Sequence, residues 1–266
     1  MKVTSIGINM NCILEDFKKK FNKDGFFIVR NFFHSRVIDD LSKKINKIMM
    51  GQCEIDYSKI WMQLDSESGL YSDLNLGGNG FKGATFNYRK IEGLEEDKLF
   101  FDIFTKPFFV EICRVIYGLN RPIKCFRTMF MNKPANKGTW LPWHQDRWNY
   151  LNKNPLVTVW MPLDTSSKEN GCVQIIRGSH HYGLINPEHE SGFLTEEQSK
   201  NYTIGKEIIY LELKPGDLAI LHNHLLHASD INTTDSPRRA LSICYMDGNT
   251  KHKIESEKKY TFLFNT

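Results

Sequence analysis

The second half of the chain constrains the fold most, because it consists of short runs of aromatic and β-branched residues separated by Gly and Pro turns. Such residues pack well on a pleated surface, so each run predicts a strand. A series of short strands without an internal repeat is typical of closed or double-sheet β architectures, such as the jelly roll. The predicted strands cover residues 126–132, 156–163, 172–176, 207–213, 218–221, 240–246 and 260–264.

The first part of the chain has a mainly helical pattern. Apolar residues at steps of three and four predict helices over residues 14–21 and 35–50. A run of aromatic and β-branched residues between them predicts a strand over 26–30. Residues 97–118 predict two further helices, which Pro107 separates. These helices are expected to pack on one side of the β core.

Together these patterns predict one domain over residues 1–266. Residues 1–120 would supply mainly helical support and residues 121–266 a jelly-roll core, so the fold class is mainly β with helical additions. The clearest loop signal is Gly77-Gly78-Asn79-Gly80. Because it lacks the Gly-Lys-Ser/Thr ending of a phosphate loop, it indicates a turn or a lid rather than a nucleotide site.

Charge, cysteine use and hydropathy narrow the functional classes. The 35 basic and 31 acidic residues give a formal net charge of +4, too small an excess to indicate nucleic acid binding. Six cysteines form no Cys-x-x-Cys pair, which favours a reducing compartment. The chain lacks a leader-like apolar N-terminus and the roughly 18 uninterrupted apolar residues of a membrane span. We expect a cytoplasmic protein with a small-molecule substrate, without nucleic acid or membrane partners, and in an oligomeric state that stays open.

The segment His144-Gln145-Asp146 is the main chemical signal. In an extended segment, residues two apart point the same way, so its imidazole and carboxylate share a face. A second imidazole would complete the His, Asp, His face by which iron(II) oxygenases hold their metal. His222, His224 and His227 are candidates, and strand parity does not choose among them. These three histidines can also bind zinc without a carboxylate, so a zinc-dependent hydrolase or isomerase and a non-catalytic jelly-roll binding protein remain alternatives.

The order of motifs resembles the phytanoyl-CoA dioxygenase (PhyH) family of Fe(II)- and 2-oxoglutarate-dependent oxygenases. The resemblance spans residues 85–247 and is strongest in blocks that run in the family's order. It implies a double-stranded β-helix, the cupin-like jelly roll, with the metal in the mouth between two sheets. The matching blocks are residues 128–134, 144–146, 159–164, 169–172, 177–180, 215–217, 225–229 and 238–242.

The resemblance also implies the site. It selects His227 as the third metal ligand beside His144 and Asp146, with Fe(II), 2-oxoglutarate and O₂ as cofactor and cosubstrates. Arg238 matches the family's anchor for the far carboxylate of 2-oxoglutarate, which a guanidinium fork can bind through two hydrogen bonds. Its neighbour Arg239 is the alternative anchor. Further positions that match cosubstrate contacts are Trp160, Ser229, Met129 and Lys90.

The implied reaction is hydroxylation of an unactivated C–H bond, with release of succinate and CO₂. In related halogenases a small residue at the Asp146 position leaves room for chloride, so the carboxylate here disfavours halogenation. Desaturation, epoxidation and cyclisation remain open. We expect a small or medium-sized metabolite as substrate, because nothing outside the cosubstrate motifs indicates a coenzyme A site. Candidate pocket residues, chosen for their positions around the motifs, are Arg147, Trp148, Asn87 and Gln174.

Overall fold

The computed structural model describes residues 10–266. In this part of the chain, nine strands form a major antiparallel sheet in the order β1-β10-β7-β12-β5-β4-β2-β3, with β13 paired to β5. Four strands form a minor sheet in the order β6-β11-β8-β9. The strands are β1 (Phe26–Val29), β2 (Trp61–Leu64), β3 (Gly78–Asn79), β4 (Tyr88–Glu92), β5 (Pro122–Lys133), β6 (Leu141–His144), β7 (Val157–Pro162), β8 (Val173–Ile176), β9 (Ile208–Tyr210), β10 (Leu218–His222), β11 (His227–Ser229), β12 (Arg238–Asp247) and β13 (Phe262–Asn265).

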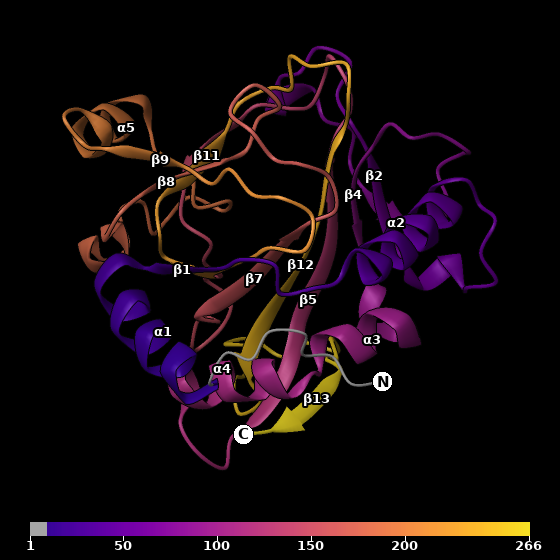
Figure 1. Cartoon of the computed structure of the whole chain (residues 1–266). Coiled ribbons are helices and arrows are strands. Elements are labelled where there is room, and N and C mark those ends of the chain that lie inside the picture. Colours follow the sequence, from indigo (N-terminus) through magenta and orange to yellow (C-terminus); the bar gives the residue numbers. More distant parts are fainter. Residues whose placement is uncertain (1–9) are drawn as a thin grey trace.

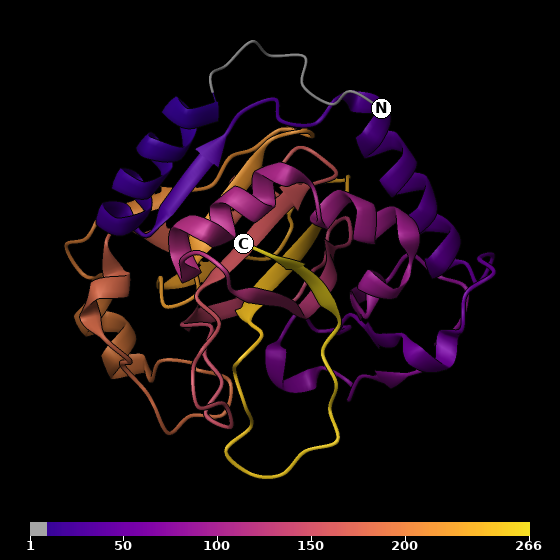
Figure 2. The ribbon, with the colours of Figure 1, turned by 90° about the horizontal axis from the view of Figure 1, so that it is seen from below.

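Helices from the first half of the chain cover the outer face of the major sheet (Figure 1). Seen from below, α4 crosses the strands, with α1 and α2 on either side of it (Figure 2). Short 3₁₀ turns connect several elements. The α-helices are α1 (Met10–Asp24), α2 (Ser35–Met49), α3 (Lys98–Phe104), α4 (Pro107–Tyr117) and α5 (Glu196–Thr203), and the 3₁₀ turns are η1 (Tyr57–Lys59), η2 (Tyr71–Asp73), η3 (Leu94–Glu96) and η4 (Ser179–Tyr182).

Strand alternation separates the core from the cavity. On β12, the side chains of Leu241, Ile243 and Tyr245 pack into the main hydrophobic core beneath the helices. Residues of the opposite parity on the same strand, Arg238 and Ser242, line the cavity between the two sheets. Because successive strand residues point to opposite faces, one strand supplies both the stabilising core and the floor of the site.

The turn before β10 ties the N-terminal segment to the barrel. The Asp217 carboxylate accepts backbone N–H groups of Asn31 at 2.9 Å and Lys214 at 3.0 Å, and it pairs with Arg30 at 2.7 Å. Gly216 has a φ of +96°, and a Cβ there would stand 2.5 Å from the Phe33 carbonyl oxygen. The turn therefore requires glycine, because both the backbone conformation and the close approach exclude a side chain.

The expected fold class is confirmed: two antiparallel sheets face each other as a jelly roll with helices on one side. Pro107 begins α4 and so separates it from α3, as expected. Elements that the sequence patterns did not predict are α5, the short ligand-bearing strands β6 and β11, and the strands β2, β3 and β4. The Gly-rich run expected as a loop contributes β3, whose Gly78 and Asn79 pair with β2.

The division into a helical first part and a β second part remains a prediction, and β1–β4 of the first part are strands of the major sheet.

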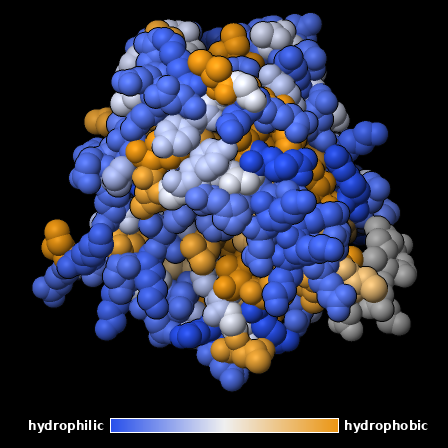
Figure 3. Space-filling view, turned by 90° about the vertical axis from the view of Figure 1, so that its left-hand side faces the viewer, coloured by the Kyte–Doolittle hydropathy of each residue, from blue (hydrophilic) through white to orange (hydrophobic). Residues whose placement is uncertain are grey.

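The face that carries α1 and α5 is mostly hydrophilic, with apolar side chains visible in small groups between polar ones (Figure 3). Within residues 10–266, no helix combines the length and the apolar character that a membrane crossing requires.

Candidate metal centre and cosubstrate pocket

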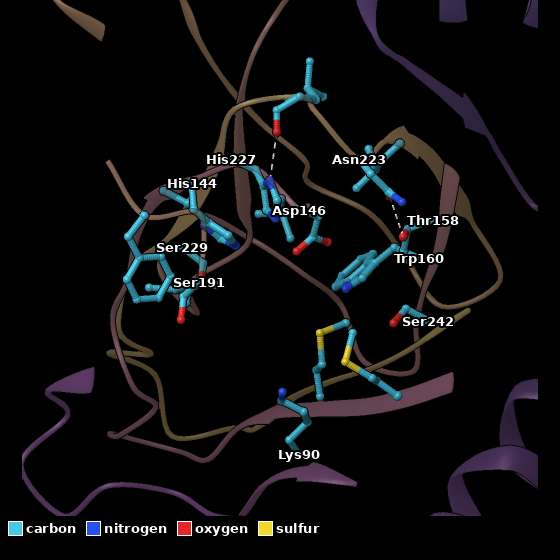
Figure 4. A pocket seen from close by; sticks show the side chains of 18 of the residues that line it. Lys90, His144, Asp146, Thr158, Trp160, Ser191, Asn223, His227, Ser229 and Ser242 are labelled. Carbon is cyan, nitrogen blue, oxygen red and sulfur yellow. Dashed lines mark hydrogen bonds between the residues drawn. The ribbon is translucent and has the colours of Figure 1, made fainter. Parts of the chain in front are cut away.

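A cavity of about 360 Å³ opens between the two sheets. Its walls come from β4, β5, β7, β10 and β12 of the major sheet and from β6, β8 and β11 of the minor sheet. Figure 4 shows His144, Asp146 and His227 grouped on one side, with Trp160 and Ser242 across from them and Lys90 pointing in from below. A cavity of this size suits a small cosubstrate together with part of a second molecule.

The His-x-Asp segment and the distal histidine meet through strand pairing. His144 ends β6, His227 begins β11, and the two are direct partners in the antiparallel register, with ring centroids 3.9 Å apart. Asp146 follows two residues after His144. Ligand atoms of these three residues lie within 4.8 Å of one another, and they form the one group of three such side chains found in residues 10–266.

Backbone hydrogen bonds orient both imidazoles. His144 Nδ1 lies 2.8 Å from the Pro142 carbonyl oxygen, and His227 Nδ1 lies 2.9 Å from that of Leu225. A carbonyl only accepts, so each Nδ1 donates and each Nε2 keeps its lone pair for a metal. Burial lowers the pKa of His144 to about 3, with repulsion from His227 adding to the effect. The ring is therefore neutral at physiological pH, as a metal ligand must be.

Gln145, between the two motif residues, fixes the segment from its other face. Its amide donates to the carbonyls of Gly183 and His224 at 2.8 and 2.9 Å, and its carbonyl oxygen accepts the Ile185 N–H at 2.9 Å. Burial opposes the ionisation of Asp146, but Arg127 and the two imidazoles hold the pKa of this carboxyl below its ordinary value. The segment thus presents a neutral imidazole and a carboxylate in a fixed orientation.

His222 and His224 do not join His227 in a metal-binding group among the described residues. Their ring centroids are 5.2 Å apart, and His222 Nδ1 accepts the backbone N–H of His224 at 3.1 Å. His222 also packs beside Phe21 of α1 and His180 of η4, with ring centroids 5.6 and 5.0 Å away. The three-histidine zinc alternative therefore has no support in this geometry.

Arg238, at the start of β12, reaches into the cavity from its far end. It is 4% exposed, its Nη2 donates to the Gly171 carbonyl at 3.1 Å, and its Cζ lies 5.7 Å from the centre of the Trp160 ring. Burial lowers its pKa to about 10. Arg238 Nε, Trp160 Nε1 and Ser242 Oγ are all buried and find no hydrogen-bond partner among residues 10–266.

These three unpartnered polar atoms are a test of whether a cosubstrate fits. Leaving a buried donor without an acceptor costs about 1–3 kcal/mol, so three such atoms around one cavity indicate that a ligand supplies their partners. A carboxylate accepts from a guanidinium, an indole N–H and a hydroxyl alike. The unpartnered donors of Arg238, Trp160 and Ser242 around the cavity therefore match the chemistry of a ligand that carries carboxylates, such as 2-oxoglutarate.

Arg239, the alternative anchor, points to the other face of β12. Its Nε and Nη2 donate to the two Asp164 carboxylate oxygens at 2.8 and 2.7 Å, and its Nη1 donates to Asn46 of α2 at 2.8 Å. These contacts satisfy the guanidinium outside the cavity and tie α2 to the sheet. Arg238 is thus the residue of the pair that can reach a cosubstrate.

Most of the remaining predicted residues line the cavity, and the others do not reach it. Met129, Ser229, Lys90 and Trp148 line the cavity together with Trp160. Lys90 pairs with Glu92 at 3.1 Å and lies over the Trp61 ring.

Arg147 borders the cavity, but its guanidinium is already bonded to its surroundings. It donates to Asn149 and to the carbonyls of Asn186, at 2.6 Å, and His189, so it fastens the nearby loop. Asn87 and Gln174 do not line this cavity. Asn87 is exposed, and Gln174 is buried with its amide donating to Asp230.

Three cavity-lining cations escaped the sequence analysis: Arg89 on β4, and Arg127 and Lys133 on β5. The two β5 residues share the parity of Met129, so the alternation of a long strand carries the signal that would have found them. Lys133 Nζ donates to the Thr139 carbonyl at 2.6 Å, and Lys133 is the register partner of Arg238. Burial holds the pKa of Lys133 well below its ordinary value.

Sequence comparison relates this chain to known proteins. The sequence matches the family described as "Phytanoyl-CoA dioxygenase (PhyH)" over residues 21–240. The "Phytanoyl-CoA dioxygenase domain-containing protein 1 homolog" of Dictyostelium discoideum is 28% identical, over 89% of this chain and 92% of its own length.

Solved structures share the fold. The "non-heme alpha ketoglutarate dependent carbocyclase SnoK from nogalamycin biosynthesis" superposes with a TM-score of 0.71 at 13% identity, over 94% of this chain and 90% of its own. The "epimerase SnoN in complex with Fe3+, alpha ketoglutarate and nogalamycin RO" gives a TM-score of 0.68 at 15% identity, over 96% and 97%.

Proposed function

This chain belongs to the phytanoyl-CoA dioxygenase (PhyH) family, and from that premise we propose that it is an Fe(II)- and 2-oxoglutarate-dependent oxygenase that hydroxylates a small or medium-sized metabolite. The observation that carries the proposal is the pairing of two features in one cavity. One is the His144, Asp146 and His227 group, and the other is the set of unpartnered donors around Arg238. A metal chelate and a carboxylate anchor are the two things that 2-oxoglutarate requires.

His144, Asp146 and His227 would hold Fe(II) through two imidazole nitrogens and one carboxylate oxygen. A set of three protein ligands would leave room at the metal for a chelating keto acid and O₂. A solved structure of the same fold supports the choice, since the SnoN structure contains Fe3+ and alpha ketoglutarate. When bound, iron and 2-oxoglutarate supply the oxidising chemistry, with succinate and CO₂ as by-products.

The chain's own residues bind and orient 2-oxoglutarate and hold the metal ligands in place. Arg238 anchors the far carboxylate of 2-oxoglutarate, while Trp160 Nε1 and Ser242 Oγ supply further hydrogen bonds. Met129 and Ser229 line the same cavity. The Nδ1 hydrogen bonds of the two histidines hold the rings in the orientation that binds metal, so the geometry exists before iron arrives.

Asp146 favours hydroxylation over halogenation. Its carboxylate would occupy the ligand position that a halide would need. Hydroxylation also needs no further coenzyme. The titles of SnoK and SnoN, a carbocyclase and an epimerase, indicate that this fold supports other outcomes in relatives.

A reducing compartment, with the cytoplasm as the simplest case, suits the cysteines. All six are free, and four of them are buried in the core. Thiols in such positions stay unpaired where glutathione keeps proteins reduced.

The test is anaerobic reconstitution with Fe(II) followed by addition of 2-oxoglutarate. The proposal predicts the weak visible charge-transfer band of an iron–keto acid chelate, and succinate on exposure to O₂. His144→Ala is expected to lose both signals, whereas His222→Ala should retain them. A colourless protein that keeps zinc through dialysis and forms no succinate would contradict the proposal.

A further inference from the structure

Arg127 is a cavity cation that the cosubstrate machinery does not use. It lies on β5, where it is opposite Cys244 of β12, whereas Lys133 at the other end of β5 is opposite Arg238. Six residues of extended strand separate the two positions, about 20 Å at roughly 3.4 Å per residue. The Arg127 and Arg238 side chains therefore enter the cavity from well-separated strand positions.

The guanidinium of Arg127 is held in place with most of its donors free. Its Cζ lies 5.2 Å from the Trp148 ring centre and 5.9 Å from that of Phe126. Its hydrogen bond to protein is one long contact, from Nη2 to Asp146 Oδ1 at 3.5 Å, and its Nε is buried without a partner. A guanidinium has five N–H donors, and one contact at the limit of hydrogen-bond length leaves most of them unused.

Apart from Arg238, the other cations of the cavity hold protein contacts shorter than the 3.5 Å contact of Arg127. Among the described residues, Lys90 pairs with Glu92 at 3.1 Å, and Arg89 donates to Gln63 at 3.0 Å. Arg147 and Lys133 donate to loop carbonyls. Arg127 therefore stands apart as a rigid, stacked guanidinium beside the metal ligands with a free hydrogen-bonding edge.

The charge of the cavity points to the same ligand chemistry. Six cationic side chains line it, against the two carboxylates of Asp146 and Glu190. Bound iron(II) and the 2-oxoglutarate dianion cancel each other, so the positive excess persists when the cofactors are present. Counting Glu92, the partner of Lys90, reduces the excess without removing it. A cavity with such an excess selects anions.

We propose that Arg127 is the substrate-binding residue for an anionic group, with carboxylate or phosphate oxygens bound at its free edge and the substrate lying against Trp148. The proposal rests on the proposed oxygenase function and specifies its substrate class. The anionic group is held close to Asp146, so the C–H bond to be oxidised lies a short distance from that anion. Arg127 binds substrate, and Arg238 binds cosubstrate.

The experiment measures succinate formation by the Fe(II)- and 2-oxoglutarate-loaded protein with a panel of matched compounds. One arm pairs carboxylic acids with their amides, and the other pairs phosphate monoesters with their alcohols. The wild type is expected to respond to anions and not to their neutral partners, and the responding arm identifies the anion. Arg127→Gln should raise the KM of a responding anion roughly 10- to 100-fold, the value of a hydrogen bond to a charged group, while Arg127→Lys restores part of it.

Two controls separate this proposal from others. The charge-transfer titration with 2-oxoglutarate alone reports on the oxygenase function and on folding. Because bound Fe(II) would keep Asp146 ionised without Arg127, Arg127→Gln should leave the midpoint of this titration within about threefold of the wild type. Arg89→Gln removes the same charge from the same cavity and should leave the KM of the anion nearly unchanged.

Three results would overturn the assignment. The first is that no anion in either arm gives more succinate than its neutral partner. The second is that Arg89→Gln raises the KM of the anion as much as Arg127→Gln does, and the third is that Arg127→Gln weakens the binding of 2-oxoglutarate as much as that of the anion. The last result would move Arg127 to the cosubstrate. A lost charge-transfer band in the wild type would instead count against the oxygenase function.

Discussion

Replacing Arg238 with alanine is expected to weaken 2-oxoglutarate binding by about two to three and a half decades. The residue is 4% exposed, so a carboxylate bound to it is shielded from water. Removing one partner of such a buried pair costs about 3–5 kcal/mol, and each 1.4 kcal/mol is tenfold in Kd. The retained hydrogen bonds from Trp160 and Ser242 place the effect toward the lower end. Iron binding should be nearly unchanged, because Arg238 is not a ligand in the His144, Asp146 and His227 group.

Arg239→Ala is the matched control, since it deletes the same side chain one residue away. Its guanidinium binds Asp164 and Asn46 outside the cavity, so its loss should lower thermal stability and change the Kd of 2-oxoglutarate by less than about threefold. Anaerobic titration of each Fe(II)-loaded variant, followed at the charge-transfer band, gives the Kd. A weaker affinity in Arg239→Ala than in Arg238→Ala would refute the reasoning.

Three further outcomes are expected. Trp160→Phe, which keeps an aromatic ring but removes the unpartnered Nε1–H, should raise the Kd of 2-oxoglutarate about 2- to 10-fold in the same titration, and an unchanged Kd would place the indole outside the contact. Gly216→Ala should lower the free energy of unfolding by at least about 2 kcal/mol more than Gly205→Ala in urea, because both glycines have positive φ but only Gly216 faces a carbonyl; equal losses would contradict the steric argument. Asp217→Asn should cost about 2 kcal/mol at neutral pH. Despite burial, the backbone N–H groups of Lys214 and Asn31 and the Arg30 side chain lower the Asp217 pKa in the folded state. This stabilisation is therefore complete above the unfolded-state pKa of about 3.9 and declines as pH falls through the folded-state value, so the difference between wild type and variant should shrink in acid; a difference that grows there would refute it.

The sequence predicted the long, strongly patterned elements well, because burial on one face dictates their residues. β7 and β12 alternate between a helix-covered core and a cavity, and α2 carries apolar residues at helical spacing. The long β5 was predicted too short at both ends. Its outer residues Pro122 and Lys133 are not typical strand residues, and the sheet rather than propensity extends the strand to them.

The missed elements are short or formed by tertiary contact. β11 comprises the three residues His227–Ser229 and exists because it pairs with β6 and β8. β3 contains Gly78, whose local preference opposes a strand. α5 did carry a local signal, because Thr195 and Gln198 form a capping box three residues apart.

The candidate site was predictable where residue type and spacing state the chemistry. The structure brings His144, Asp146 and His227 together, and it turns Arg238 rather than Arg239 into the cavity. Of the residues chosen for their positions around the motifs, Trp148 lines the cavity. Gln174 does not line the cavity, because a neighbour in sequence need not point to the site. Arg127 shares the parity of Met129 on β5, which indicates the cavity face, but its contact with Asp146 depends on how the strands are ordered.

The most direct test of the account is anomalous diffraction at the iron edge, from crystals grown anaerobically with Fe(II) and 2-oxoglutarate. The account predicts one iron peak, about 2.1 Å from a nitrogen of His144, a nitrogen of His227 and an oxygen of Asp146, with the far carboxylate of 2-oxoglutarate on Arg238. Iron bound instead between His222 and His224, or 2-oxoglutarate bound away from Arg238, would contradict it.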